Sequence, residues 1–473
     1  MNFYTDLDKY GKNLAVITDK GEQLTYDAFL FECDNLMGSL ISRRLLFLVC
    51  NNSLESLVAY IGALRKGVVP VMINAGVDSQ LYKHLYEQYK PSYVYAPRDW
   101  EAIVEDVETE QFKKLEDYRT FTLYATDCAE EYELYPELAL LLTTSGSTGS
   151  PKLVRQSYKN IDANADSIAK YLGIVSSDRA ITTMPMSYTY CLSIINSHLL
   201  MGASLVMSDY SIIQREFWTL FKESEPTTFG GVPYIYEQLK KLRFGRMNLP
   251  SLRYITQAGG KLSKEMAEEF NEICEKKGIQ LIVMYGQTEA TARMAYLPWD
   301  HAKEKAGSMG IAIPGGEFSL IDVDEKAIDE PEIVGELVYR GPNVTLGYAE
   351  GYKDLKLGDE RQGVLVTGDM AKRDKDGFYY IVGRKKRFLK MYGNRVNLDE
   401  VEGLLKKEGY ECVCAGVDDN MKIYTTAVAD EAHKNIIGFL SKTLGFVQRS
   451  FQVTVIDEIP RNESGKVLYS ALN

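Results

Sequence analysis

The stretch TTSGSTGSPK, residues 143–152, decides how the rest of this chain is interpreted. Six of its ten residues are Ser or Thr, and it overlaps the end of the apolar run LALLLT, which predicts a strand covered on both faces. Gly146 and Gly149 allow a tight turn that exposes backbone N–H groups, and Lys152 adds a positive charge. Donors and charge gathered behind a buried strand predict an anion site, for which phosphate is the natural ligand.

The same ten residues are also compatible with a Ser- and Gly-rich surface loop that binds nothing. Their spacing differs from that of the common nucleotide-binding P-loop, which needs Gly, four residues and then Gly-Lys-Ser/Thr. Here Pro151 precedes Lys152, and Leu153 follows it where that pattern needs a hydroxyl. The loop alone leaves both interpretations open, and the rest of the chain has to decide between them.

Composition and charge exclude several classes of protein. The chain has 473 residues, 45% hydrophobic and 25% charged, as expected of a globular protein with several domains. Lys plus Arg is 54 and Asp plus Glu is 66, and the resulting net charge of −12 argues against a broad nucleic-acid surface. The apolar runs are too short to cross a bilayer and the N-terminus lacks the layout of a signal peptide, so a cytoplasmic location is expected. Seven scattered cysteines and four distant histidines favour free thiols and argue against a metal site built from imidazoles.

Strand and helix patterns alternate along the first part of the chain. Up to about residue 305, short apolar runs alternate with amphipathic segments, as in SLESLVAYIGAL (53–64), GVVPVMI (67–73), SYKNIDANADSIAKYLG (157–173) and IQLIVMYG (279–286). This alternation predicts an α/β fold with layered helices and mostly parallel strands. After that point Gly and Pro become dense, and short alternating strands predict a β-rich subdomain. We expect a large N-terminal domain over residues 1–385 and a small α+β C-terminal domain over residues 386–473.

Further motifs follow TTSGSTGSPK in a fixed order. They are YGQTEAT (285–291), GELVYRGPNVTLGY (335–348), TGD (367–369), DGFYYIVGRKKRFLK (376–390) and PRNESGK (460–466). Together they resemble the motifs of the adenylate-forming superfamily, which includes acyl-CoA synthetases, adenylation domains of peptide synthetases, and luciferases. The resemblance covers residues 143–466, and the strands and helices expected before it agree with that superfamily.

The resemblance implies a reaction of a carboxylic acid in two steps. The carboxylate attacks the α-phosphate of ATP to give an acyl-adenylate and pyrophosphate, and a thiol then attacks the acyl carbon and releases AMP. The implied cofactors are ATP, Mg²⁺ and coenzyme A, with the phosphopantetheine of a carrier protein as the alternative thiol. Because the first step joins two anions, it needs cations and hydrogen-bond donors around the phosphorus.

The positions of the motifs imply roles for individual residues. The β- and γ-phosphates would lie against the loop, at Thr144, Ser145, Gly146, Ser147, Thr148, Gly149 and Lys152. The rest of the nucleotide would lie against Gly259, Gly260, Tyr285, Gly286, Gln287, Thr288, Asp369 and Arg384. Glu289 would hold Mg²⁺, Thr288 would donate to the α-phosphate, and Lys466 would be the ammonium that reaches the reacting atoms. Each role has a structural alternative: packing for Tyr285, a surface salt bridge for Arg384, and a solvated side chain for Glu289 or Lys466.

The basic run RKKRFLK, residues 384–390, has two interpretations. By itself, it is typical of a nucleic-acid patch or a targeting signal, but the background charge of −12 argues against this. By the resemblance, the joint between the domains lies here, with Lys386 at the hinge of a small domain that rotates between two poses. Lys390, which we predict to be catalytic, and Gly393 would then lie on the face that serves thiol attack, where Gly393 leaves room for a pantetheine channel.

The segment MPMSYTYCLSIINSHLLMGA, residues 184–203, aligns with the wall of the acid pocket in this superfamily. We predict that Tyr188, Tyr190, Gly259 and Arg293 line that pocket, while the two tyrosines are equally compatible with an aromatic core. The segment contains no Asp, which disfavours a free amino acid as the substrate. The chain is short for the superfamily, which favours a small or medium acid, and Arg293 is placed to hold a polar or second acidic group on it.

The main hypothesis is therefore an AMP-forming acid–thiol ligase. We expect no carrier domain beyond Asn473, so coenzyme A is favoured, and a stand-alone adenylation enzyme that loads a carrier protein is the nearest alternative. A phosphate-releasing NTPase or kinase would instead form ADP. A binding protein without turnover conflicts with the presence of Glu289, Asp369 and Lys466 at their motif positions.

Overall fold

The computed structural model describes residues 3–101, 112–127, 132–143, 152–392, 394–461 and 467–472. These residues belong to two compact units. The first unit takes in the described residues up to 143, together with 152–317 and 339–365, and the second takes in 318–338 and 366–472. The hinge at Lys386 stays a prediction.

A nine-stranded sheet forms one half of the first unit. Its strands are, in spatial order, β16 (Ile311–Ala312), β15 (Ala295–Tyr296), β14 (Gln280–Tyr285), β13 (Tyr254–Gln257), β12 (Thr228–Gly231), β10 (Arg179–Ile181), β11 (Ser204–Met207), β1 (Leu14–Thr18) and β2 (Gln23–Thr25). The strands from β14 to β1 are parallel, and the remaining ones pair antiparallel at the two edges.

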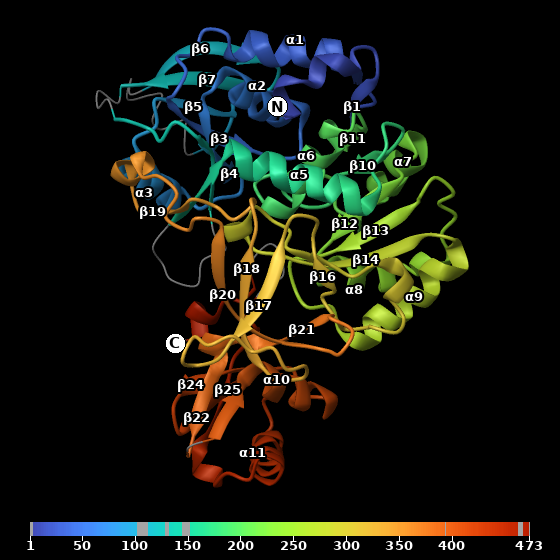
Figure 1. The fold of residues 1–473 in the computed structure, drawn as a ribbon, viewed down its shortest axis with the longest axis vertical. Coiled ribbons are helices and arrows are strands. Elements are labelled where there is room, and N and C mark those ends of the chain that lie inside the picture. Colours follow the sequence, from blue (N-terminus) through green and yellow to red (C-terminus); the bar gives the residue numbers. More distant parts are fainter. Residues whose placement is uncertain are drawn as a thin grey trace. The chain divides into compact units, whose positions relative to one another are not determined.

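An eight-stranded sheet forms the other half of this unit. Its strands are β19 (Gly347–Ala349), β9 (Leu153–Ser157), β8 (Leu138–Thr143), β4 (Val69–Asn74), β3 (Leu45–Cys50), β5 (Tyr93–Pro97), β7 (Phe121–Thr126) and β6 (Phe112–Tyr118). The central strands β8, β4, β3 and β5 are parallel, whereas both edges are antiparallel. The prediction of mostly parallel strands therefore holds for the sheet centres, and the α/β fold class is confirmed (Figure 1).

The described residues of the first unit form several helices, and those predicted at residues 53–64 and 157–173 are among them. The helices are α1 (Tyr26–Met37), α2 (Leu54–Lys66), α3 (Ser79–Tyr89), α5 (Tyr158–Leu172), α6 (Thr189–Leu200), α7 (Arg215–Ser224), α8 (Pro233–Lys241) and α9 (Lys264–Lys277). Ser53 caps α2 by accepting a hydrogen bond from the backbone N–H of Ser56. On α5, Ser157 and Asn160 form a reciprocal capping box, and Gly173 ends the helix at φ 58°.

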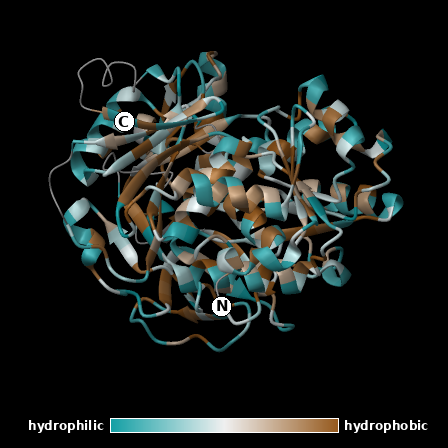
Figure 2. Ribbon diagram, turned by 90° about the horizontal axis from the view of Figure 1, so that it is seen from above, coloured by the Kyte–Doolittle hydropathy of each residue, from teal (hydrophilic) through white to brown (hydrophobic). Residues whose placement is uncertain are grey.

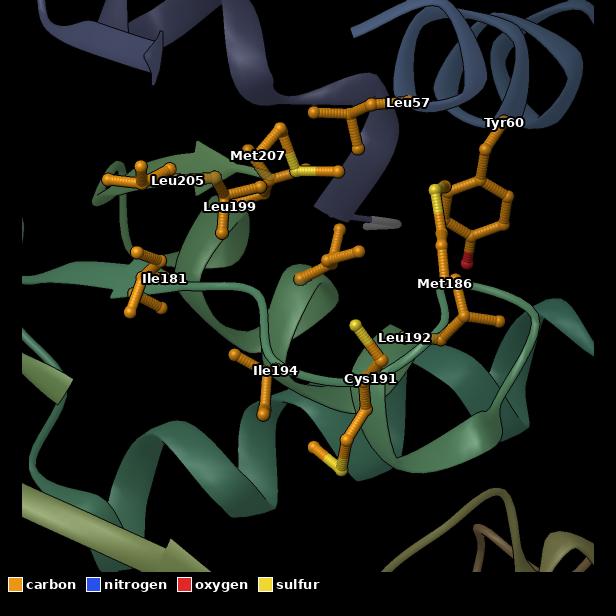
Figure 3. Close-up of a cluster of buried hydrophobic side chains, with 14 of the residues drawn as sticks. Leu57, Tyr60, Ile181, Met186, Cys191, Leu192, Ile194, Leu199, Leu205 and Met207 are labelled. Carbon is orange, nitrogen blue, oxygen red and sulfur yellow. The ribbon is translucent and has the colours of Figure 1, made fainter. Parts of the chain in front are cut away.

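The core of this unit lies between its two sheets, around α2 and α6. Ten of the thirteen residues of α2 and eleven of the twelve of α6 are buried, as expected of helices covered on all sides. Figure 3 shows Leu57 and Tyr60 of α2 in one cluster of buried side chains with Cys191 and Leu192 of α6 and Met207 of β11. Hydrophobic residues follow the strands and the inner helix faces, and hydrophilic ones follow the outer faces (Figure 2).

The second unit contains three smaller sheets and two helices. The sheets are β17 (Glu317–Ile321), β18 (Gly335–Arg340), β20 (Val364–Arg373) and β21 (Tyr379–Arg384); β22 (Phe388–Met391) and β23 (Asn394–Asn397); and β24 (Cys412–Val417), β25 (Asn420–Thr425) and β26 (Phe451–Val455). Helices α10 (Leu398–Lys407) and α11 (Asp430–Leu444) pack their apolar faces into a separate core with Ile423 and Phe451. The predicted β-rich stretch and the small α+β module are both present.

Strand β9, which follows the predicted phosphate loop, was missing from the sequence prediction. We expected the loop after β8 to lead into a helix, but β9 comes first and pairs antiparallel with β8, with Thr143 opposite Leu153. The segment LVRQS escaped notice because its Arg155 and Gln156 are polar, yet both are buried. Arg155 is buried because backbone carbonyls of Tyr348 and Leu357, distant in sequence, accept its hydrogen bonds.

Among the helices that the structure describes, none combines the length and apolar character that a membrane span requires.

Candidate active site

The predicted nucleotide residues of the first unit lie at the carboxyl ends of parallel strands. In β12, β13 and β14, Gly231 is opposite Gln257, which in turn is opposite Val283, so the three strands end at one edge of the sheet. Gly259 follows β13, Tyr285 ends β14, and the 3-10 helix η4 (Thr288–Ala290) follows directly. Ligands bind at this edge in open parallel sheets.

Glu289, in η4, is fixed through both its backbone and its side chain. Its carbonyl oxygen accepts hydrogen bonds from Thr345 N at 3.1 Å, Thr345 Oγ1 at 2.9 Å and Arg361 Nη1 at 3.0 Å. Its carboxylate Oε1 accepts a hydrogen bond from the Tyr348 hydroxyl at 2.6 Å. Burial, reinforced by this carboxylate, raises the pKa of Tyr348 to about 12, so the phenol keeps the proton that it donates.

This arrangement fits a magnesium ion shared between protein and phosphates. Within the described residues, there is no group of three or more His, Cys, Asp or Glu side chains able to hold a metal by themselves. Mg²⁺ commonly takes only one or two carboxylates from the protein and completes its shell with phosphate oxygens and water. A single oriented carboxylate such as Glu289 is sufficient for that kind of site.

The turn between Tyr285 and Arg293 doubles back on itself. A Cβ atom at Gly286 would lie 1.5 Å from the carbonyl oxygen of Ala292, so only glycine fits there. Thr291 and Ala292 both have positive φ, 59° and 126°, which is strained for residues with a Cβ. Asn343 holds the turn, because its carbonyl accepts from Thr291 Oγ1 at 2.7 Å and its amide donates to the Arg293 carbonyl at 3.0 Å.

The structure brings the predicted acid-pocket residues together. The rings of Tyr188 and Tyr190 meet edge to face with centroids 6.4 Å apart, and a Cβ at Gly259 would lie 2.5 Å from the Tyr188 hydroxyl. The Arg293 guanidinium lies over the Tyr190 ring, 4.9 Å from its centroid. Burial raises the pKa of Tyr188 to about 12, so its phenol is neutral at physiological pH.

The phosphate loop is described only at its end. Thr144, Ser145, Gly146, Ser147, Thr148 and Gly149 lie outside the described residues, so their predicted role is not tested. Lys152 is half exposed and forms an ion pair with Glu350. To bind a phosphate, the Lys152 ammonium has to leave its ion pair with Glu350. The free-energy cost of breaking this pair is small because solvent screens both charges.

The second unit carries the predicted ribose pair on two neighbouring strands. Asp369 of β20 lies opposite Arg384 of β21, and Arg384 Nε is 3.6 Å from Asp369 Oδ1. Asp369 is 6% exposed, whereas the side chain of Arg384 is 65% exposed and free to rotate toward solvent. Thr367 Oγ1 accepts a hydrogen bond from the Asp369 backbone N–H at 3.1 Å, which fixes the backbone of this carboxylate.

The basic run at 384–390 is divided between surface and interior. Lys386 and Lys390 are exposed, whereas Lys385 pairs with Glu336 at 2.7 Å. Arg387 points inward, where Asp399 and Glu402 accept from it at 2.8 and 2.5 Å. Such inward pairing argues against a nucleic-acid patch. Gly393 and Lys466 lie outside the described residues.

Several residues that hold this site were not predicted. Tyr348 ends a motif that was recognised, so the motif was a signal for it. Asn343 lies in the same motif and donates to the Arg293 carbonyl, whereas Arg361, which donates to the Glu289 carbonyl, lies outside every recognised motif.

Comparisons with known proteins identify the family of the chain. The family model described as AMP-binding enzyme matches residues 3–349, well over half of the chain. The medium-chain fatty-acid–CoA ligase of Escherichia coli (strain K12) is 28% identical over 343 residues, which are 70% of this chain and 60% of the relative, so the chain spans less than two thirds of that relative. The oxalate–CoA ligase of Saccharomyces cerevisiae is 24% identical over 525 residues, covering 98% of this chain and 95% of the relative.

Solved structures share the fold. O-succinylbenzoate coenzyme A synthetase (MenE) from Bacillus subtilis, in complex with ATP and magnesium ion, superimposes with a TM-score of 0.79 at 21% identity, covering 99% of this chain and 98% of that one. The family model and the curated CoA ligases together confirm the resemblance to the adenylate-forming superfamily. The ordered motifs, the position of their residues at the ends of parallel strands and the matching family model all lead to one conclusion: the chain belongs to the family of AMP-binding enzymes.

Proposed function

We propose that this chain activates a carboxylic acid with ATP and transfers the acyl group to coenzyme A. In the first step, a carboxylate oxygen of the acid bonds to the α-phosphorus of ATP, and the bond from that phosphorus to the bridging oxygen breaks, which releases pyrophosphate. In the second, the sulfur of coenzyme A bonds to the acyl carbon, the thiol proton is lost, and AMP departs with the ester oxygen. The relatives in the comparison are named as CoA ligases, which supports this choice of thiol.

The fixed carboxylate of Glu289 is the observation that carries the proposal. It lies at the carboxyl end of β14 with its backbone held by Thr345 and Arg361 and one carboxylate oxygen held by Tyr348. Mg²⁺ held there supplies positive charge that offsets the phosphates as the two anions approach. Thr288, next to Glu289, would donate to the α-phosphate, and Tyr285 and Gly259 would lie along the adenine.

The remaining roles belong to the second unit and to the two loops. Asp369 would accept hydrogen bonds from the ribose hydroxyls, and Arg384 would support them. Lys466 would bring its ammonium to the α-phosphate in one pose of the small domain, and Lys390 and Gly393 would serve the thiol in the other. Lys386 would be the pivot between the poses, which its exposure permits because it need not be buried in either.

Acid-dependent exchange of pyrophosphate into ATP tests the first step. The wild-type chain should catalyse exchange and, with coenzyme A added, release AMP and form a thioester without any carrier protein. Lys466→Ala should lower exchange by about 100-fold or more, because it removes charge stabilisation used only at the reacting phosphorus, while ATP still binds. Lys442→Ala, on the exposed side of α11, is the matched control and should exchange normally.

Three outcomes would contradict the proposal. Formation of ADP with no AMP would point to the kinase or NTPase alternative. AMP formation that needs a carrier protein and does not proceed with coenzyme A would favour the stand-alone adenylation enzyme. Undiminished exchange in Lys466→Ala would remove the role given to Lys466. A small or medium acid and a cytoplasmic location stay predictions.

A further inference from the structure

The guanidinium of Arg293 is buried among neutral groups. The residue is 1% exposed. Within the described residues, it donates from Nε to Ser193 Oγ at 3.0 Å and from Nη1 to the Tyr171 hydroxyl and the Met284 sulfur, both at 3.1 Å. Its Nη2 is shielded from solvent and donates to no atom in this part of the chain. A full positive charge with one unused donor is thus held inside the first unit.

The other buried arginines of the described chain are neutralised by acids. Arg155, 0% exposed, pairs with Glu360, and Arg387, 9% exposed, pairs with Asp399 and Glu402. Burial of a charge is costly unless a counter-charge and hydrogen bonds accompany it. Arg293 has no acidic partner among the described residues. An anionic ligand that binds there would explain why its buried charge is tolerated.

The backbone is built to hold Arg293 in this place. Thr291 and Ala292, the two residues before it, both adopt strained positive φ. Asn164 and Asn343 both donate to the Arg293 carbonyl oxygen, at 2.9 and 3.0 Å. A residue whose only purpose was to fill the core would need neither a charge nor this strain.

The guanidinium of Arg293 contacts a residue that is predicted to line the acid pocket. The guanidinium lies 4.9 Å from the ring centroid of Tyr190, whose hydroxyl is 2.8 Å from Thr256 Oγ1 on β13. Tyr190 also contacts Tyr188, and the Tyr188 hydroxyl packs against Gly259. Glycine is needed at position 230 as well, because a Cβ there would lie 2.8 Å from the Tyr190 hydroxyl. The predicted pocket wall is therefore made of neutral hydroxyls and bare backbone, with one cation.

We propose that Arg293 binds a second carboxylate on the acyl substrate, so that this pocket selects dicarboxylic acids over monocarboxylic acids of the same length. The inference rests on the proposed function, because it names the class of acid that the site activates. A carboxylate would accept a charge-assisted hydrogen bond from Nη2 and neutralise the guanidinium. A methyl group in the same place would leave the charge unpaired, so the monocarboxylic acid is rejected.

Matched acids test the proposal on the wild-type chain. Succinate, glutarate, adipate and suberate are compared with butyrate, valerate, hexanoate and octanoate in acid-dependent pyrophosphate release. We expect kcat/KM for the preferred dicarboxylic acid to exceed that for its monocarboxylic partner by about 100-fold, the size expected of one hydrogen bond between charged groups. The monomethyl ester of the preferred acid should behave like the monocarboxylic acid.

Variants then assign the preference to Arg293. Arg293→Met, similar in length but uncharged, should lose about 100-fold on the dicarboxylic acid and be unchanged or improved on the monocarboxylic acid. Arg293→Lys keeps the charge with fewer directed donors and should retain part of the preference. Arg246→Met, at an exposed position in the same unit, is the control and should keep the wild-type preference.

Each outcome decides a different claim. If neither series supports AMP formation but another carboxylic acid does, only this inference fails; if no carboxylic acid supports AMP formation, the proposed function fails with it. If monocarboxylic acids are activated as well as dicarboxylic ones, only the inference is overturned. The same holds if Arg293→Met keeps the wild-type preference. If Arg293→Met does not fold, the wild-type comparison and the Arg293→Lys preference still decide the question.

Discussion

At the residue scale, the first unit depends on side chains that orient other side chains. Tyr348 donates to Glu289, and Arg361, which lies over the Tyr348 ring at 4.7 Å, also donates to the Glu289 carbonyl. Neither residue needs to touch a substrate to matter. Their effect is to hold one carboxylate in a fixed direction, which is what a metal site with a single protein carboxylate requires.

Replacing Tyr348 with Phe should weaken the response to magnesium. We expect the Mg²⁺ concentration for half-maximal pyrophosphate release to rise about 3- to 10-fold, because the hydrogen bond joins a charged group but water competes with it. Water can compete because Tyr348 is 39% exposed. Tyr132→Phe, whose hydroxyl donates to backbone carbonyls of Tyr89 and Lys90, is the control. An unchanged magnesium dependence in a folded Tyr348→Phe protein would contradict the positioning role.

At the element scale, one tight turn sets the geometry of both Glu289, the proposed metal ligand, and Arg293, which is predicted to line the acid pocket. The chain leaves β14, passes Glu289 in η4 and returns to β15 within about ten residues. The return is possible because Gly286 has no side chain to block the Ala292 carbonyl. Asn343 also stabilises the turn by hydrogen bonds with Thr291 and Arg293. The same few contacts therefore position both Glu289 and Arg293.

Gly286→Ala should destabilise the protein strongly. A Cβ 1.5 Å from the Ala292 carbonyl oxygen cannot be relieved by rotating a side chain, so the backbone has to move. We expect a loss of about 3 kcal/mol or more in the free energy of unfolding, at the upper end for overpacked sites. The change is measured as the shift in Tm.

Gly278→Ala is the matched control for that turn. Gly278 ends α9 at φ 69° and a Cβ there would meet no atom within 4 Å. Only the cost of a left-handed residue applies, about 1 kcal/mol. Equal Tm shifts for the two variants would mean that the approach at Gly286 does not constrain the turn.

At the scale of the whole molecule, two ionisable groups that are not among the predicted site residues change how stability responds to pH. His198 of α6 lies in the core between the two sheets, and burial lowers its pKa from 6.5 to about 4. Asp162 of α5 accepts from the Phe3 backbone N–H at 2.9 Å, and burial raises its pKa from 3.8 to about 6. The two shifts act on folding with opposite signs.

Removing His198 should make the protein more resistant to acid. Between pH 6.5 and 4, His198 is protonated in the unfolded chain but stays neutral in the folded chain. The free energy of unfolding therefore falls as pH falls, by up to about 3 kcal/mol. In His198→Gln, the drop in Tm from pH 7 to pH 4.5 should therefore be smaller than in the wild type. An equal drop would show that His198 is not held neutral.

Asp162→Asn should change the same measurement in the opposite direction. The folded chain keeps a proton on Asp162 between pH 4 and 6 that the unfolded chain loses, so stability rises as pH falls through this window. Without that contribution, the drop in Tm at pH 4.5 should be larger than in the wild type. A smaller drop would contradict the raised pKa of Asp162.

The sequence predicted where helices begin better than it predicted which distant residues contact one another. Ser53 and Ser157 marked the starts of α2 and α5 because a cap is a local hydrogen bond between near neighbours. Glu289 was placed correctly at the end of β14 because an apolar run followed by polar residues is also local. Strand β9 was missed because the partners that allow Arg155 to be buried come from the chain around residue 350.

The sequence by itself determined the family, through motifs whose order needs no structure, and the α/β alternation, because periodicity is a property of neighbouring residues. Only the tertiary structure decided what surrounds each charge. Arg293 is 100 residues from Ser193 and 129 from Asn164, and its unused Nη2 exists only because the folded chain brings neutral groups around it. Electrostatic free energy depends on distances in space, and these are set when the sheets and helices pack.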